Sequence, residues 1–397
     1  MGDTIGGVPT DGIVISSASS WTARRLATWL LWGSLAIHVP IALIAADRSK
    51  SSHYDLDNYY NIGTRPGRPY VDFPVEFPLA TVQTFRTLGP MAGDRARFGV
   101  SLVILNVAAD LAIASGLWWG WGITAAACYA LIVTPIVDLF FLRTDLWSTA
   151  LATIGVAAWR RERGTLAAIG LVAGGAFKLW PLALLPLLVA PARGSRRAAP
   201  LAAAIAAGLV VLGGWVWVAG SAGLYQVLTF RGAQGWEIES TVGSVWMLFD
   251  TSSMRVESGA WRIGETIGPI SVVLFALGTS LSLWMVWRGA RTRRLGAGWA
   301  GGLSALLFMS ALLSPQFAAW IAPAAGVAWV EGDTRIAALT TLVVFLTNLV
   351  WKSFNPLTRG DMGAIVMLLA RNVLLAVLAL DAARLVTQAP LEPGDDA

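Results

Sequence analysis

Apolar runs recur through most of the chain, each of roughly the 20 residues that an α-helix needs to cross the hydrocarbon layer of a membrane. Of the 397 residues, 56% are hydrophobic and only 13% are charged, and the mean hydropathy is +0.63. A soluble protein of this size could not cover its surface with so few charges. The pattern predicts an all-α polytopic membrane protein with apolar spans near 26–46, 98–119, 121–142, 146–160, 165–190, 199–219, 267–288, 297–313, 316–330, 335–351 and 362–386.

The polar ends of the chain bound a single integral membrane domain, predicted over residues 26–386. Residues 1–25 lack the basic, apolar and cleavage regions of a signal peptide, so we expect a flexible cytoplasmic tail there and a second one at 387–397. One cysteine, Cys128, and two histidines, His38 and His53, exclude an internal disulfide, a cysteine cluster and a multi-histidine metal site. The formal charge of +5 is typical of arginine-rich cytoplasmic loops, so no nucleic-acid partner is expected.

The distribution of arginine predicts how the chain crosses the membrane. Arg24 and Arg25 place the N-terminus inside, and a simple crossing at 165–190 would then put the arginines that follow it outside. The conflict disappears if 165–190 is a broken hairpin that enters and leaves on the cytoplasmic side. Its apex would be Lys178 to Pro181, since proline breaks a helix and a lysine at membrane depth needs a partner. We therefore expect about ten transmembrane helices plus this hairpin; a single kinked span is the alternative.

With this topology, the segments richest in polar residues all fall on the outer side of the membrane. The cytoplasmic loops contain little except arginine. This asymmetry predicts that the extracytoplasmic loops form the working face of the protein. The outer segments are 47–97, the apex at Lys178, 220–266, 314–317 and 352–361.

The first outer loop places carboxylates among aromatic residues and prolines, directly after the first span. It contains Asp55, Asp57, Tyr59, Asp72 and Glu76. A positioned carboxylate can take the proton from an acceptor hydroxyl, and aromatic rings suit the apolar faces of sugars. An Asp-x-Asp string by itself is weak evidence for a catalytic site. Its position directly after the first span strengthens that interpretation. The alternative is a solvated acidic loop with structural prolines.

A second set of polar residues lies in the later outer segments. Arg231 could pair with a phosphate and Gln234 could bind sugar hydroxyls, whereas Glu237 or Glu239 could instead pair with Arg231 for purely structural reasons. The segment that contains Gln316 is either a binding element or a tight turn.

Three ionisable residues fall within predicted spans, where burial of a charge is costly and each charge needs a partner or a task. They are Asp110, Asp138 and Arg371. A structural Asp110–Arg371 pair is the favoured interpretation. Arg371 lies in the outer half of its span and could also serve a lipid phosphate.

The order and spacing of these motifs resemble the GT-C membrane glycosyltransferases, specifically glycosyltransferase family 87. That family includes polyprenyl-phosphate-mannose-dependent mannosyltransferases of phosphatidylinositol mannoside synthesis. The resemblance implies a GT-C-like fold with the active site at the outer leaflet, no nucleotide sugar, an inverting reaction and Asp55 as general base. The mannoside-forming members use a histidine-containing stretch where this chain has Ser314 to Phe317, so arabinose stays open beside mannose. The similar segments are 55–59, 67–78, 178–181, 231–240 and 314–316.

We therefore expect an inverting glycosyltransferase of the inner (plasma) membrane that moves a sugar from a polyprenyl phosphate donor to a glycolipid or glycan acceptor. No cofactor is required; Asp55 and Asp57 could hold a divalent metal, but none is expected. A polytopic transporter or lipid-linked sugar flippase is the alternative, and a non-catalytic scaffold is a third. The expected substrate-binding residues are Asp57, Tyr59, Asp72, Glu76, Lys178, Trp180, Arg231, Gln234, Glu239, Gln316 and Arg371.

Overall fold

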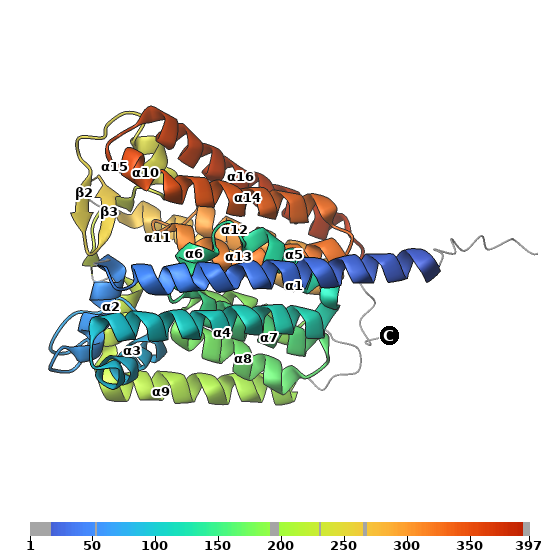
Figure 1. Cartoon of the computed structure of the whole chain (residues 1–397), viewed down its shortest axis with the longest axis horizontal. Helices are drawn as coiled ribbons and strands as arrows, with labels where there is room; N and C mark the ends of the chain where they lie inside the picture. The colour runs from blue at the N-terminus through green and yellow to red at the C-terminus, as the bar shows by residue number, and fades with distance from the viewer. Residues whose placement is uncertain (1–16, 52–53, 191–197, 230–231, 265–267, 392–397) are drawn as a thin grey trace, which may run out of the picture.

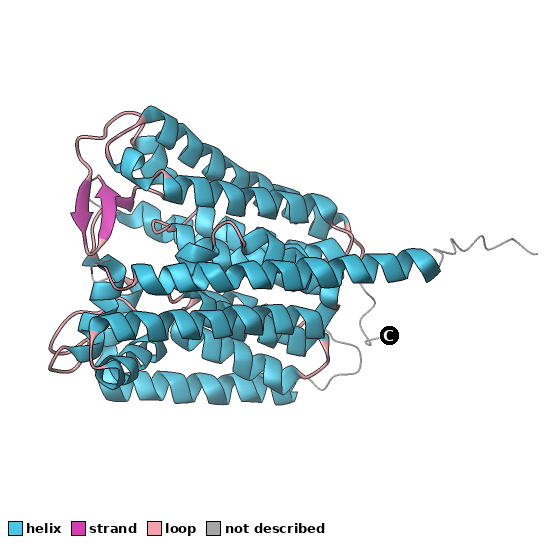
Figure 2. Ribbon diagram, in the orientation of Figure 1, coloured by secondary structure: helices cyan, strands magenta, loops and turns pink. Residues whose placement is uncertain are grey.

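The computed structural model describes residues 17–51, 54–190, 198–229, 232–264 and 268–391, and it is an elongated bundle of helices (Figures 1 and 2). This architecture agrees with the predicted all-α membrane class. Within the described residues, six helices are long and apolar enough to cross a membrane. They are α1 (Ser17–Arg48), α4 (Arg95–Trp121), α9 (Ala198–Leu228), α11 (Gly268–Arg291), α14 (Thr334–Lys352) and α16 (Met362–Gln388).

The remaining elements divide between the interior of the bundle and one of its ends. We call this end the loop end, and the opposite end, where α1 begins and α16 ends, the terminal end (Figure 1). The interior elements are α5 (Ile123–Val133), α6 (Val137–Phe141), α7 (Asp145–Arg160), α8 (Gly164–Phe177), η1 (Trp180–Leu188), α12 (Leu295–Phe308), η3 (Pro315–Phe317) and α13 (Ala318–Val330). At the loop end lie α2 (Tyr54–Thr64), α3 (Leu79–Ala92), α10 (Thr241–Trp246), α15 (Phe354–Thr358) and an antiparallel sheet of order β1-β3-β2, made of β1 (Trp236–Glu237), β2 (Arg255–Glu257) and β3 (Ala260–Ile263).

The predicted break near Lys178 is present. Helix α8 has 14 residues and ends at Phe177, Lys178 is extended, and η1 then packs back along α8. A Cβ on Gly174 would lie 3.2 Å from Pro181, so the two limbs touch closely. A 14-residue helix is only about 21 Å long, short of the roughly 30 Å that a crossing needs.

Two further breaks differ from the predicted spans. The apolar run 121–142 is divided into α5 and α6, and α12 and α13 have 14 and 13 residues, with a turn at 309–317 between them. The sequence predicted a break at 314–317 between two spans, and the turn at 309–317 agrees with it. The break within 121–142 was missed because a helix buried in a protein is as apolar as one that crosses lipid. The predicted full-length crossings at 121–142, 297–313 and 316–330 are therefore wrong in length, although helices do form there.

The predicted outer loop 47–97 is also more ordered than expected, because it contains α2 and α3. The two helices bury Tyr59 and Phe85 against each other, with the rings stacked at 4.9 Å. A Cβ on Gly63 would lie 2.5 Å from the Phe85 carbonyl oxygen, so the backbones are in contact. Helix α1 begins at Ser17, inside the predicted N-terminal tail.

The charged residues inside the spans pair differently from the prediction. Asp110 is bonded to His38 Nδ1 and to the Tyr129 hydroxyl, both at 2.8 Å, so the predicted Asp110–Arg371 pair is wrong. Helix α1 packs against α4 and α5, which places His38 beside Asp110. Asp138 pairs with Arg48 at 3.5 Å. Each of these two carboxylates therefore has a partner, and Asp110 is the buried one of the two.

Candidate functional site

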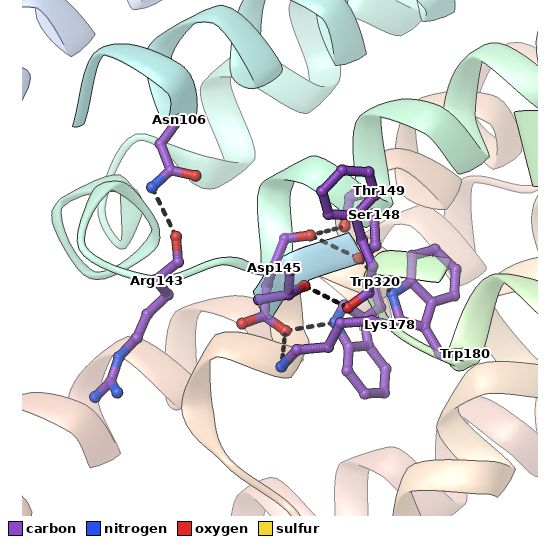
Figure 3. A network of polar contacts seen from close by, with 10 residues as sticks. Asn106, Arg143, Asp145, Ser148, Thr149, Lys178, Trp180 and Trp320 are labelled. Carbon is purple, nitrogen blue, oxygen red and sulfur yellow. Dashed lines mark hydrogen bonds and ion pairs between the residues drawn. The ribbon is translucent and has the colours of Figure 1, made fainter. Parts of the chain in front are cut away.

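Asp55 lies in the first turn of α2 and forms an ion pair with Arg143, from the turn between α6 and α7. The Arg143 side chain is buried, and its guanidinium carbon lies 5.7 Å from the centroid of the Trp351 ring. The side-chain amide of Asn106 donates to the Arg143 carbonyl at 2.6 Å (Figure 3). It also donates to the Phe141 carbonyl at 2.9 Å, and the two bonds hold this turn in place. The predicted base is thus joined to a cation from a distant part of the chain.

Tyr59 follows Asp55 by one turn of α2 and is buried between Phe85 and Phe77, whose ring centroids lie 4.9 and 5.4 Å away. Burial raises the pKa of Tyr59 well above its ordinary value; Asp55 adds to this effect, and Arg143 opposes it. The hydroxyl therefore stays protonated at physiological pH and presents a donor beside Asp55 and Arg143.

Lys178, at the break after α8, is paired with the buried carboxylate of Asp145 at 2.9 Å. The Trp320 indole N–H donates to the same Asp145 oxygen, also at 2.9 Å (Figure 3). The Lys178 ammonium lies 5.1 Å from the centroid of the Phe317 ring. The lysine that the sequence placed at membrane depth thus has the partner that its position requires.

Three aromatic rings lie next to this pair as a continuous stack. Trp180 and Trp320 are stacked with centroids 5.5 Å apart, and Phe317 stacks on Trp320 at 4.1 Å. The Trp180 indole N–H donates to the Ser148 hydroxyl at 3.0 Å. Next to Phe317, the side-chain oxygen of Gln316 is buried and accepts no hydrogen bond from the described residues. Trp180 and Trp320 are buried, so this aromatic stack lies within the bundle beside the polar groups.

The segment after β1 covers this region from the loop end. Glu237 accepts a hydrogen bond from the Leu313 amide at 2.7 Å, and Arg371 donates to the Glu239 carbonyl at 2.9 Å. Burial raises the pKa of Glu239 to about 8; Glu237 adds to this shift, whereas Arg371 and Arg143 oppose it. Glu239 is therefore largely protonated at neutral pH and close enough to Arg143 to interact with it electrostatically.

The other carboxylates of the first segment have local partners. Asp57 forms an ion pair with Arg95 at the start of α4. Asp72 accepts from the Arg68 amide at 2.6 Å, which closes a turn of the backbone. Glu76 accepts from the Asn58 side chain at 3.2 Å. These contacts are those of residues that brace the α2–α3 segment.

Besides Glu239, two residues of the 220–266 segment were predicted to bind substrate, Gln234 and Arg231. Gln234 is exposed, and its side chain donates to the Gly232 carbonyl at 3.1 Å, within its own loop. Arg231 lies outside the described residues.

Sequence reasoning missed Arg143, Asp145 and Trp320. Arg143 and Asp145 lie at the boundary between two predicted spans, 121–142 and 146–160. A closely spaced cation and carboxylate interrupting a long apolar run was the signal, because ionisable residues at membrane depth usually have a function.

A metal site is not evident within the described part of the chain, where no three or more His, Cys, Asp or Glu side chains are grouped to hold an ion. Asp55 and Asp57 are each engaged by a different arginine. Comparison with known proteins does not assign a family: no protein-family model matches the chain, and no curated protein matches it significantly.

Proposed function

We propose that this protein is an inverting membrane glycosyltransferase that moves a sugar from a polyprenyl phosphate donor to a lipid or glycan acceptor. The observation that supports it best is a set of two ion pairs, Asp55–Arg143 and Lys178–Asp145, whose members Arg143 and Asp145 are two residues apart, with an aromatic stack beside the second pair. Asp55 supplies the carboxylate, and Arg143 and Lys178 supply the cations. A carboxylate can accept a proton, cations can bind a leaving phosphate, and aromatic rings suit a sugar ring.

The distribution of arginine supports an outward-facing site. The last turns of α7 and α11, the connections that follow them and the first turn of α14 lie toward the terminal end. They contain Arg160, Arg161, Arg163, Arg288, Arg291, Arg293, Arg294 and Arg335. The positive-inside rule assigns this end to the cytoplasm and the loop end to the outside. A donor lipid in the outer leaflet could then reach the site between the helices.

In the proposed reaction, the acceptor hydroxyl attacks the anomeric carbon from the face opposite the phosphate. The new carbon–oxygen bond forms as the bond from the anomeric carbon to the phosphate oxygen breaks, and that electron pair leaves with the polyprenyl phosphate. The hydroxyl proton passes to Asp55, a step to which a positioned base contributes about 10²–10⁴-fold. Nearby cations stabilise the charge that develops on the leaving group.

The direct test is incubation of the purified protein, in lipid nanodiscs, with polyprenyl phosphate mannose or arabinose and a membrane lipid extract, with products identified by mass. Asp55→Asn should reduce transfer at least about a hundredfold while the protein still folds. Asp57→Asn is the matched comparison from the same helix and should reduce it less. If amide variants of Asp55, Asp57, Asp72 and Glu76 all keep full activity, the transferase proposal fails.

A transporter or lipid-linked sugar flippase is the second candidate, and one observation favours it. Broken helices occur in both halves of the chain, at Lys178 and at the 309–317 turn, and transporters build midplane sites from such elements. Reconstituted vesicles distinguish the two functions. Movement of a labelled lipid-linked sugar across the bilayer, without a new glycosylated product, would favour the flippase.

A further inference from the structure

Arg143 combines burial with an incomplete set of hydrogen bonds. Its Nε is buried and has no hydrogen-bond acceptor among the described residues, although buried polar groups in proteins are nearly always paired. Its ion-pair partner is only partly enclosed, since the side chain of Asp55 is 26% exposed and that of Arg143 is 10% exposed. The guanidinium thus has one N–H without an acceptor, and its ion pair with Asp55 can be reached from outside through the partly exposed carboxylate.

The surroundings of Arg143 suit an exchange of one anion for another. A guanidinium presents its N–H groups as a planar fork that matches carboxylate and phosphate equally well. Tyr59 adds a protonated hydroxyl, and the Trp351 ring lies 5.7 Å from the guanidinium carbon. The neighbouring Glu239 is largely neutral because burial raises its pKa to about 8. Asp55 forms the ion pair with Arg143, so it is the anion that a phosphate would displace.

We propose that Arg143 binds the phosphate of the lipid donor and that the Asp55 carboxylate occupies Arg143 until that phosphate arrives. This inference rests on the proposed function and adds an order of events to it. The phosphate takes the guanidinium from Asp55, and the released carboxylate then accepts the proton of the acceptor hydroxyl. No covalent bond changes in the exchange, and one anion replaces another beside the same cation.

The binding test compares farnesyl phosphate with farnesol, which lacks the phosphate, on the full-length protein in detergent. Arg143→Gln should weaken binding of the phosphate about ten- to a hundredfold, the usual effect of losing a charge-assisted contact, and leave farnesol unchanged. Arg143→Lys should retain part of the affinity. The matched control is Arg95→Gln, because Arg95 pairs with Asp57 from the same helix α2; it should leave the affinity for farnesyl phosphate unchanged.

Asp55→Asn gives a more specific test, because it removes the carboxylate that competes with phosphate for Arg143. It should tighten binding of farnesyl phosphate by at least about threefold, the effect of releasing a partly exposed ion pair. This gain should vanish in the Arg143→Gln background. An equal gain in both backgrounds would show simple charge repulsion and overturn the exchange, and unchanged affinity in both Arg143 variants would overturn the phosphate site.

The outcomes separate this inference from the proposed function. If Arg143→Gln does not elute as a monodisperse protein in size exclusion, Arg143→Lys and Asp55→Asn decide the question. If the protein transfers sugar but its affinity for farnesyl phosphate does not depend on Arg143, this inference is wrong and the proposed function stands. If the affinity for farnesyl phosphate depends on Arg143 but the protein transfers no sugar, the proposed function is wrong and the phosphate site at Arg143 is supported.

Discussion

Replacing Lys178 by methionine removes the cation that faces Asp145 inside the bundle. The two charged atoms are 2.9 Å apart, and the side chains of Lys178 and Asp145 are 16% and 2% exposed. Removing one partner of a buried pair leaves an uncompensated charge and costs about 3–5 kcal/mol. Because the Trp320 indole still donates to Asp145, we expect the lower part of this range, about 3 kcal/mol.

The chain contains a matched exposed pair as the control. Lys50 and Asp47 have the same 2.9 Å separation, but their side chains are 62% and 78% exposed. Exposed pairs contribute about 0–1 kcal/mol, so Lys50→Met should change the free energy of unfolding by less than about 1 kcal/mol. Both variants can be measured by titrating SDS into mixed micelles and following tryptophan fluorescence.

Adding Asp145→Asn to Lys178→Met removes the unpaired buried carboxylate. The double variant should regain at least about 1 kcal/mol of the free energy of unfolding. The reasoning is refuted if Lys178→Met and Lys50→Met cost the same, or if Asp145→Asn restores nothing. Lys178 would then not compensate Asp145.

Three further predictions follow from the structure. Because burial raises the pKa of Glu239 to about 8, its ionisation should destabilise the fold as pH rises from about 4.5 to 8, and Glu239→Gln should flatten this part of the profile of melting temperature against pH. Gly326→Ala should destabilise by about 1–3 kcal/mol in the same SDS titration, because its Cβ would lie 2.3 Å from a backbone oxygen of α5, whereas Gly213→Ala meets nothing within 4 Å and should not destabilise. In a cysteine-free variant, Ser253→Cys at the loop end should react with an impermeant thiol reagent added to whole cells and Arg163→Cys should not; labelling of the second alone would invert the proposed orientation.

The sequence by itself determined the class of the protein and the position of most helices along the chain. Apolar content leaves only a membrane environment for such a chain, and the predicted spans lie close to helices in the structure. It also determined the break at Lys178, because Pro181 interrupts the helix and the lysine resists burial in lipid. These are local properties, set by composition and by the backbone geometry of single residues.

Only the tertiary structure decided which helices are long enough to cross and which charges meet. The apolar run 121–142 has the composition of one membrane span, and its division into the short helices α5 and α6 appears only in the folded structure. Asp55 reaches Arg143, and Glu239 reaches Arg371, through the lateral packing of elements far apart in the chain. Apolar periodicity places a residue along a helix but does not say which other helix will lie beside it, because close packing among many similar apolar surfaces selects the neighbours.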